Sequence, residues 1–569
     1  MTEQDKETSP SRRGDIELSN RHEVTSHSII QRDDAPEELF EYKQSNETGQ
    51  GTQVTAEKES AAGPTEELRD EHTEEPTEEP AEQKAYSSFT LWQKRSIILA
   101  ATLGAFFSPF SAQIYFPALN TLSEELHVSP SKINLTITTY MILQGIAPSF
   151  VGAFSDNAGR RPAYIICFVI YIAADIALAL QSNYVALLIL RMVQSAGSSG
   201  TVALANAVVA DCVTSAERGM YIGITSLTNI LAPSIGPILG GIISQYAGWK
   251  WIFGFLAILA TVFIILFVLF FPETCRSIVG DGTIPPPKWN RSIKNYIEER
   301  AKQPDYSERN ARAAKRRISF PNPLGTLIVL TQKSEGCVLF FAGIVYAGFY
   351  AIVSGLPSEF KDIYGYDDLK IGLCYLPMAG GSLLAAWTQG KFIDWSYRWE
   401  AKRLGMEVIK SSQQDLSKFP IEKARLQVAL PVLLLCSIFT VAYGWILHSR
   451  TTVAGPLIML FLLGYTLIAS TQSVNILIVD INPGKAGTVT AAFNLIRCLL
   501  GAGSTALIHP MTNAMGYGWT FTFIGLLYIA LSPLLFIVMR WGPSWRKQSV
   551  ERNAKIAREK EKKDEEGRG

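Results

Sequence analysis

The 569 residues of this chain would be enough for several soluble domains, but 47% of them are hydrophobic and the mean hydropathy is positive, which favours a membrane protein. The formal net charge is zero, yet Asp and Glu outnumber Lys and Arg about two and a half times in residues 1–88, so the rest of the chain is net basic. The seven cysteines show no paired spacing, which argues against a disulfide framework and against a metal site.

Residues 1–88 form a polar segment rich in Glu, Ser, Thr and Gln. Such a segment cannot bury enough apolar surface to offset the entropy lost on ordering, so we expect a disordered acidic tail, either inert or regulatory. The first apolar run begins too late and is too long for a cleavable signal peptide, and we expect it to act as an uncleaved signal anchor.

Beyond this tail, apolar stretches of about 20 residues follow one another, and each is long enough to cross a hydrocarbon core of roughly 30 Å. The pattern predicts an all-α integral membrane protein with twelve transmembrane helices. The expected spans are residues 96–118, 131–153, 162–181, 184–211, 217–245, 249–271, 335–358, 369–392, 427–448, 454–480, 487–513 and 518–540.

The charge of the loops predicts how these helices are oriented. Lys and Arg concentrate in the central loop and in the C-terminal tail, whereas four loops on the opposite side of the bundle, 119–130, 182–183, 246–248 and 514–517, contain neither. By the positive-inside rule, both termini and the central loop therefore face the cytoplasm. The chain divides into an acidic tail, a first six-helix bundle, a basic central loop, a second six-helix bundle and a charged C-terminal tail, which occupy residues 1–88, 89–272, 273–333, 334–541 and 542–569.

A charged loop motif occurs twice. Residues 152–161 read GAFSDNAGRR and residues 390–398 read GKFIDWSYR, and both stretches lie between two apolar runs. Asp211 and Asp480 also end corresponding spans, the fourth and the tenth. Because a loop repeated at the same point of two halves indicates duplication, we expect two pseudo-symmetric six-helix bundles that rock around a central site.

The repeated charges predict a conformational latch at the cytoplasmic helix ends. Asp156, Arg160 and Asp211 can form a charge network that holds one conformation and releases when a proton or substrate binds. The alternative is that they are ordinary charges flanking membrane helices, but the repeated spacing favours the latch. The predicted latch residues, with a looser second copy in the second half, are Gly152, Asp156, Gly159, Arg160, Arg161, Asp211, Asp394, Arg398 and Asp480.

Charged residues within the spans are few, and such residues are usually functional. Asp175 and Arg191 lie at similar depth on adjacent antiparallel helices. They can pair, either as a structural ion pair or as a proton site in which Arg191 tunes Asp175. Arg497 lies near mid-membrane without an acidic partner in its own helix, and we expect it to bind an anionic group rather than only to pack helices.

Polar and aromatic residues three or four positions apart share a helix face and complete the predicted substrate site. The predicted substrate contacts are Arg191, Gln194, Tyr346, Tyr350, Gln472, Asn475 and Arg497. A run of Gly and Pro in span 5 predicts tight packing, a bend between the halves that limits leakage, or both; it comprises Gly236, Pro237, Gly240 and Gly241. No nucleophile–base pair, metal-ligand cluster or phosphate loop stands out, so we expect neither an enzyme nor a bound metal or cofactor.

These motifs together resemble the major facilitator superfamily. GAFSDNAGRR resembles its loop 2–3 motif, and LRMVQSAG at residues 190–197 resembles its span 4 motif, whose Arg, here Arg191, is associated with proton coupling. GPILGG at residues 236–241 is similar to the span 5 motif of the twelve-span drug:proton antiporters. A fungal branch that includes quinidine-resistance-type multidrug exporters and citrate exporters has segments similar to IYFPAL, PETCRSIVGDGT and RCLLGAG at residues 114–119, 272–283 and 497–503.

The resemblance covers about residues 88–545 and implies alternating access with efflux driven by the proton gradient. We therefore predict a monomeric proton-coupled antiporter of the plasma membrane that exports a small organic molecule and contacts lipid but no nucleic acid. Two buried arginines, one in each half, favour a carboxylate-bearing substrate such as an organic acid. A broad drug or secondary-metabolite efflux pump and a non-transporting receptor of the same fold are the alternatives.

Overall fold

The structure of the protein is a computed structural model that describes residues 86–292, 324–405, 419–482 and 486–566. Every element given below belongs to one compact unit within residues 82–569. The predicted disordered tail therefore lies outside the described residues, except for residues 86–88, which lead into the first helix.

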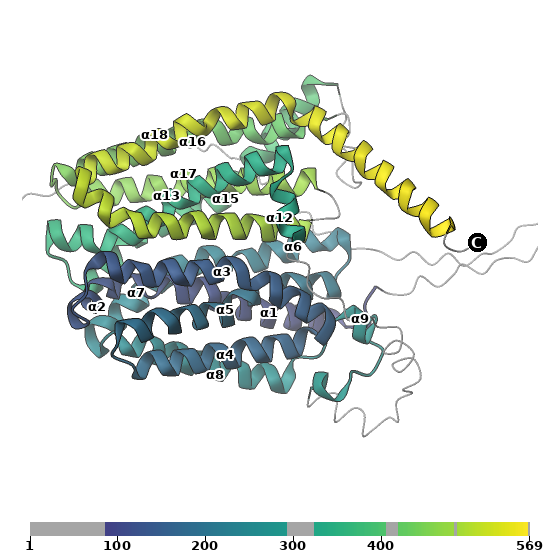
Figure 1. Ribbon diagram of the computed structural model, residues 1–569, viewed down its shortest axis with the longest axis horizontal. Helices are drawn as coiled ribbons and strands as arrows, with labels where there is room; N and C mark the ends of the chain where they lie inside the picture. The colour runs from purple at the N-terminus through teal and green to yellow at the C-terminus, as the bar shows by residue number, and fades with distance from the viewer. Residues whose placement is uncertain (1–85, 293–323, 406–418, 483–485, 567–569) are drawn as a thin grey trace, which may run out of the picture. The chain divides into compact units, whose positions relative to one another are not determined.

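The first half contains six helical stretches that are long and apolar enough to cross a membrane, and they lie together in Figure 1. Its elements are α1 (Leu91–Gln113), η1 (Phe116–Ala118), α2 (Leu119–Glu125), α3 (Pro130–Ala158), α4 (Arg160–Leu180), α5 (Tyr184–Cys212), α6 (Ser215–Ser226), α7 (Thr228–Ala247) and α8 (Lys250–Phe270). Two short elements follow in the central loop, α9 (Arg276–Val279) and η2 (Lys288–Asn290).

The second half repeats this arrangement, and its helices also lie together in Figure 1. Its elements are α12 (Leu324–Leu330), α13 (Lys333–Tyr364), α14 (Asp368–Cys374), α15 (Leu376–Arg403), α16 (Ile421–His448), α17 (Ala454–Ile481) and α18 (Ala486–Glu566). Within α18, Gly516 has a φ of 74°, a conformation that glycine adopts readily and that separates two helices.

The prediction of an all-α membrane protein with twelve spans in two bundles is confirmed. Across the described ranges, eleven helices have the length and hydropathy of a membrane span. The last of them, Gly487–Gln548, holds two of the predicted spans because Gly516 divides it.

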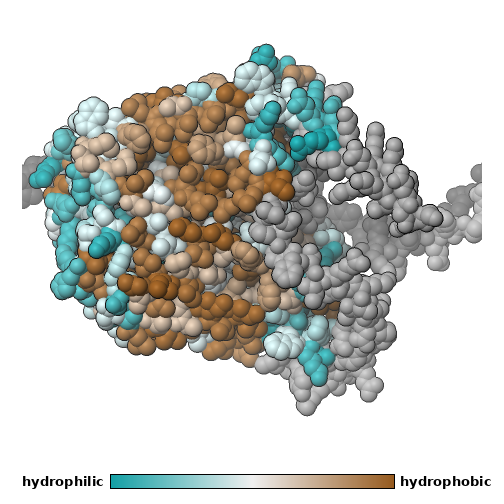
Figure 2. Space-filling view, viewed as in Figure 1, coloured by the Kyte–Doolittle hydropathy of each residue, from teal (hydrophilic) through white to brown (hydrophobic). Residues whose placement is uncertain are grey.

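The surface of the helices is apolar where a membrane would surround them. Figure 2 shows hydrophobic residues across the middle of the visible face and hydrophilic residues at its two ends. On α8, the exposed side chains include Ile258, Val262, Ile265 and Phe270, each more than half exposed. A soluble monomer rarely shows so large an apolar surface, so these residues face lipid.

Close contact between α4 and α5 positions the charges predicted inside the first half. A Cβ at Gly197 of α5 would lie 2.7 Å from the backbone nitrogen of Tyr171 and 2.9 Å from the carbonyl oxygen of Cys167 in α4. Only glycine permits this approach, and small residues at such contacts are typical of membrane helices. The approach brings Asp175 of α4 beside Gln194 of α5.

Candidate functional site

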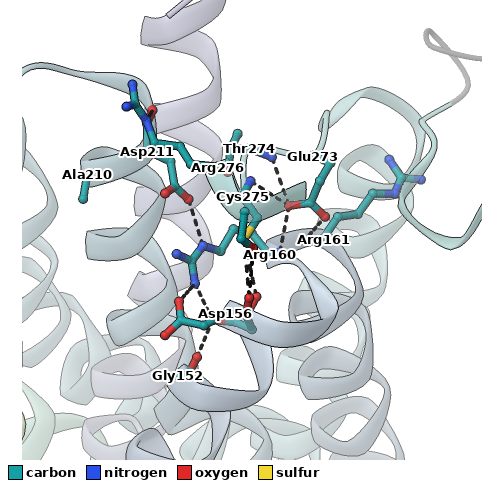
Figure 3. A network of polar contacts seen from close by, with 12 residues as sticks. Gly152, Asp156, Arg160, Arg161, Ala210, Asp211, Glu273, Thr274, Cys275 and Arg276 are labelled. Carbon is teal, nitrogen blue, oxygen red and sulfur yellow. Dashed lines mark hydrogen bonds and ion pairs between the residues drawn. The ribbon is translucent and has the colours of Figure 1, made fainter. Parts of the chain in front are cut away.

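An ion-pair network lies where α3 ends and α4 begins (Figure 3). Gly159 has a φ of 110°, and the chain turns there so that the Arg160 side chain lies between Asp156 and Asp211. The guanidinium donates to Asp156 Oδ1 at 2.5 Å and to Asp211 Oδ2 at 2.8 Å. The side chains of Arg160 and Asp211 are each 9% exposed, whereas that of Asp156 is 67% exposed. We call Asp156, Arg160 and Asp211 the latch network.

Two further predicted latch residues contribute in different ways. The Gly152 carbonyl accepts a hydrogen bond from the Ser155 hydroxyl, and that hydroxyl accepts from Arg160 at 2.7 Å. Arg161 donates to the carbonyl oxygens of Phe271 at 2.6 Å and Val268 at 2.7 Å. Arg161 therefore connects α4 to the end of α8 and lies outside the latch network.

Glu273 holds the first turn of α4, and we did not predict it as a site residue. Its buried carboxylate accepts from the backbone N–H groups of Arg160 at 2.8 Å and Arg161 at 3.2 Å, and from the Asn290 amide at 2.6 Å. A carboxylate there satisfies free N–H groups and complements the positive end of the helix dipole. The signal in the sequence was the PET tripeptide directly after an apolar span.

Tyr86, near the start of the described residues, and Arg276 of the central loop contact each other and the end of α5, next to the latch network. The Arg276 guanidinium carbon lies 3.5 Å from the centroid of the Tyr86 ring, and its Nε donates to the Asp211 carbonyl at 3.0 Å. The Tyr86 hydroxyl donates to the Ala210 carbonyl at 3.1 Å. Residues that the sequence assigned to a polar tail and a basic loop thus lie against the end of α5.

The second copy of the motif does not form the predicted network. Asp394 and Arg398 are both exposed, and Arg398 Nε reaches only the Asp394 carbonyl, at 3.3 Å. Asp480 instead pairs with Arg425 of α16, at 3.0 Å. The position that matches Gly159 is Tyr397, for which a positive φ is strained, so α15 continues to Arg403 instead of turning after the motif.

A buried chain of side chains joins Arg191 to Asp175 in the first half. The Arg191 guanidinium donates to Gln194 Oε1 at 2.6 Å, and Gln194 Nε2 donates to Asp175 Oδ1 at 2.5 Å. All three side chains are fully buried. The rings of Tyr115 and Tyr140 each lie with their centroid 4.3 Å from the guanidinium carbon. The predicted pairing is thus indirect, because an amide lies between the two charges.

Arg497 of α18 lies where the two halves meet. It donates to Asn494 Oδ1 at 2.9 Å, and Asn494 in turn donates to the Gln144 carbonyl of α3 at 3.0 Å. The Tyr346 ring centroid lies 5.4 Å from the guanidinium carbon. Within the described ranges Arg497 forms no ion pair, and its Nε has no hydrogen-bond partner. The half-buried guanidinium therefore keeps donor capacity for another group.

The remaining predicted substrate contacts lie on two helices of the second half. Tyr346 packs edge-on against Phe493, with centroids 5.6 Å apart, and the largely buried Tyr350 packs in the same way against Phe349, at 5.4 Å. On α17, Asn475 is half-buried and Gln472 is exposed. Neither α17 side chain belongs to the hydrogen-bonded chains around Arg191 and Arg497.

The Gly and Pro run of span 5 packs α7 closely against other elements. A Cβ at Gly236 would lie 3.1 Å from the Ile114 nitrogen, and Gly240 lies against the carbonyl of the same residue. Gly241 faces α14 of the other half, where a Cβ would lie 2.5 Å from the Asp368 carbonyl oxygen. Pro237 lies inside a continuous α7. Gly241 and Pro237 thus bring the two halves into backbone contact, whereas Gly236 and Gly240 pack α7 against its own half.

The sequence and the fold agree with one family. The family model described as Major Facilitator Superfamily matches residues 101–506. The chain belongs to the major facilitator superfamily. MFS-type transporter phiD of a fungal species is 48% identical to this chain over 484 residues, which cover 84% of this chain and 73% of that protein.

Two other known proteins are similar to this superfamily member. Citrate exporter 1 of Aspergillus niger is 36% identical over 467 residues, which cover 80% of this chain and 88% of that protein. The structure of the xylose transporter XylE from E. coli superposes with a TM-score of 0.53 at 14% identity, covering 78% of this chain and 99% of that one, and so shares the fold. Proteins of this superfamily are transporters, and this chain is accordingly a multi-pass membrane transporter and not an enzyme.

In this major facilitator protein, the halves meet at the end where α2 and α14 lie, which we call the α2 end. The Asn120 amide donates to the Pro357 carbonyl at 2.7 Å. Thr121 and Ser244 of the first half both donate to Asp368 Oδ2, at 2.7 Å and 2.5 Å. At the opposite end, which holds the latch network, no hydrogen bond or ion pair between described residues joins the halves. The transporter is thus closed at the α2 end.

Proposed function

We propose that this chain is a proton-coupled antiporter that exports a small organic molecule bearing a carboxylate. The observation that carries the substrate class is Arg497, a half-buried guanidinium at the junction of the halves with a buried nitrogen that lacks a partner in the described part of the chain. Charged groups inside a membrane protein are costly unless they bind something, and a guanidinium binds a carboxylate through two parallel hydrogen bonds.

The surroundings of Arg497 support an organic anion over an inorganic one. Tyr346 lies beside the guanidinium, and Phe493 and Phe349 lie against Tyr346. Such rings offer apolar surface to the carbon skeleton of a substrate, while Arg497 and Asn494 offer polar contacts. The similarity to Citrate exporter 1 is further support for an acid substrate.

Proton coupling is the second part of the proposal, and the chain from Asp175 through Gln194 to Arg191 supports it. Both charges are fully buried, yet the amide of Gln194 keeps them from pairing directly. A carboxyl held in this way can lose or gain a proton when the helices move, because the field of Arg191 at Asp175 changes with their separation.

The direction of transport in the proposal depends on orientation. The excess of Lys and Arg in the central loop and the C-terminal tail supports a cytoplasmic location for the latch end and both termini. The α2 end then faces outward, and the protons that enter through the plasma membrane drive the substrate out.

The test uses the purified full-length protein in lipid vesicles with an acidic lumen. Weak acids that cross lipid unaided collect on the alkaline side, so accumulation of a labelled acid in an acidic lumen requires exchange for protons. The panel contains citrate, an aromatic carboxylic acid and a cationic drug. We expect accumulation of an acid, its loss on addition of a protonophore, and at least about tenfold less accumulation for Arg497→Gln, since one charge-assisted contact contributes about 1.5–3 kcal/mol.

Two variants control this experiment. Arg497→Lys keeps the charge but loses the planar guanidinium that can bind a carboxylate through two hydrogen bonds, and we expect it to retain part of the activity. Arg398→Gln removes an exposed guanidinium and should leave transport unchanged. Equal accumulation by wild type and Arg497→Gln would contradict the anion site.

The aromatic side chains around Arg497 also favour a second candidate, a broad-specificity pump for amphipathic drugs or secondary metabolites. Under that function, drug accumulation would continue in Arg497→Gln and would fall in Tyr346→Ala. Vesicles that move no member of the panel under any gradient would contradict both candidates and would favour a receptor of the same fold.

A further inference from the structure

Glu359 of α13 is a buried carboxyl in the second half that takes no part in the sites described above. Its side chain is 1% exposed. The hydroxyl of Tyr443, which is fully buried on α16, donates to Oε2 at 2.8 Å. The other oxygen, Oε1, is buried and has no hydrogen-bond partner among the described residues.

No cation among the described residues balances this carboxyl. The ionisable groups that face it are Asp362 on α13, Tyr375 between α14 and α15, Tyr443 on α16 and Tyr517 on α18, and all of these are acids. His509 of α18 lies nearby, where it faces Asp362 and lines a small cavity with Pro357 and Ser358. Lys361, two positions along the chain, pairs with Glu124 of the other half.

A carboxylate in these surroundings would be a buried and uncompensated charge. Such a charge is so costly that the group takes up a proton instead. These surroundings therefore favour the neutral acid in the conformation that is closed at the α2 end. The side chain folds back over Gly355, where an added Cβ would lie 2.6 Å from Oε1, so the fold leaves room for the acid at this position.

Glu359 also lies between two contacts that close the α2 end. Pro357, two residues earlier, accepts from Asn120, and Lys361, two residues later, pairs with Glu124. Tyr375, one of the groups that face Glu359, stacks on Phe116 of the first half, with ring centroids 6.4 Å apart. When the halves separate at the α2 end, Tyr375 loses this contact, and water gains a path to the carboxyl. Water stabilises the charged form, so the open conformation favours the carboxylate and the closed conformation favours the acid.

We propose that Glu359 is a proton-binding site that must be occupied before the halves close at the α2 end. A proton from the solution on that side binds a carboxylate oxygen, the carboxylate becomes the neutral acid, and α13 then packs against α2. Because the closed state binds one more proton than the open state, acid on that side drives closing. The inference rests on the proposed proton coupling for its role in transport, and it adds an acid in the second half to Asp175 in the first.

The experiment measures closing directly and needs no substrate. Ser129 and Ser449 are exposed residues at the α2 end, one in each half, and each is replaced by Cys for a spin label in the full-length protein, with the half-buried Cys337 replaced by Ala. Distance distributions between the labels are recorded from about pH 8 to about pH 5, where carboxyls that move between water and a buried site titrate. We expect the ratio of closed to open molecules to rise as the pH falls, by up to about tenfold per pH unit for one linked proton.

Three variants decide between a proton site and a structural residue. Glu359→Gln is neutral at every pH, and we expect its distribution to be closed throughout and independent of pH. Glu359→Asp keeps an ionisable group and should keep the pH response. Tyr443→Phe removes the hydrogen bond to Oε2 but retains the acid, so the response should persist with a shifted midpoint.

Two results would overturn the inference, and both differ from failure of the proposed function. If Glu359→Gln keeps the pH response of the wild type, another group binds the proton. If Glu359→Gln does not fold, a wild-type distribution that is independent of pH refutes the site by itself. Vesicles without proton-driven transport, together with a pH response that depends on Glu359, would contradict the proposed coupling and leave the proton site standing.

Discussion

Arg160 of α4 donates to Asp211 of α5 at 2.8 Å, and the side chain of each residue is only 9% exposed. The same guanidinium contacts Asp156, whose side chain is 67% exposed. Removing one member of a buried pair leaves an uncompensated charge, whereas an exposed pair contributes little. The two acids of the latch network therefore differ in role: Asp211 holds Arg160 in place, and Asp156 lies where it can exchange partners.

The first prediction concerns the stability of this network. Asp211→Asn should reduce the free energy of unfolding by up to about 3 kcal/mol, because Arg160 loses its buried counter-charge. Asp156→Asn should cost less than about 1 kcal/mol, since water screens that pair. Thermal unfolding of the two variants in detergent measures the difference. Equal melting temperatures for both would contradict the unequal roles.

Cys275 offers a native reporter of the same region. Its thiol is buried against the Asp156 carbonyl, 3.9 Å away, and the Ser277 hydroxyl, 3.2 Å away. Burial raises the pKa of the Cys275 thiol, so little thiolate is present at neutral pH and more forms as the pH rises. We predict slow reaction with a maleimide at pH near 7 and faster reaction at higher pH.

Asp211→Asn should also speed this reaction, because loss of the latch network exposes the segment that carries Cys275. Mass spectrometry of the labelled peptide measures the rate, and Cys275→Ser identifies the peptide. The fully buried Cys436 within α16 serves as the control and should stay unlabelled. A Cys275 rate in Asp211→Asn equal to that of the wild type would show that the segment does not depend on the network.

A third prediction concerns the first turn of α4. Glu273→Gln keeps the shape of the side chain but replaces one accepting oxygen with a donor that faces the N–H groups of Arg160 and Arg161. It should reduce stability by about 1–3 kcal/mol, as expected for buried donors left unsatisfied. Asp394→Asn, at an exposed position, is the matched control and should stay within about 0.5 kcal/mol of the wild type.

The sequence was sufficient to predict the bundles and the members of the latch network. Apolar runs of membrane length give the spans, and the charged positions of Asp156, Arg160 and Asp211 at the ends of spans, matched in the second half, mark the network. The repeated spacing of the motif led to a wrong prediction in the second half, where no equivalent network forms. Tyr397 occupies the position of Gly159, so the helix continues to Arg403 instead of turning. Asp480 then pairs with Arg425 and not with Arg398.

Other parts of the site depend on contacts between distant segments, and no local pattern reveals them. Glu273 reaches α4 across more than 100 residues of chain, with a separation of 113 from Arg160. The role of Gln194 as a link between Arg191 and Asp175 needs the rotamers of three side chains. In the sequence, Glu359 looks like an ordinary charged residue near the end of a span, because its burial and its contact with Tyr443 depend on a different helix.

The fourth prediction tests the backbone contact between the halves. Gly241 of α7 faces the Asp368 carbonyl and the Cα of Gly372, at distances of 2.5 Å and 3.3 Å from where its Cβ would lie. Gly241→Val would hold the halves apart there, so we expect the open state of the α2 end to be populated at all pH values. Gly223→Ala is the control, since nothing lies within 4 Å of its Cβ position. Spin labels at residues 129 and 449 report the outcome, and a closed distribution in Gly241→Val would contradict it.

The last prediction concerns Asp175. Asp175→Asn keeps an oxygen that can accept from Gln194 but removes the ionisable group, and Arg191 loses a nearby negative charge. Exchange of labelled for unlabelled substrate moves no net protons, whereas accumulation in an acidic lumen requires a proton to be carried on each cycle. If Asp175 carries that proton, the variant should keep exchange within about threefold of the wild type and lose accumulation by at least about tenfold. Asp394→Asn should keep both activities. Loss of both exchange and accumulation in Asp175→Asn would indicate a structural role for the carboxylate. Retention of both activities would show that another group carries the proton, and Glu359 would then be the next acid to replace.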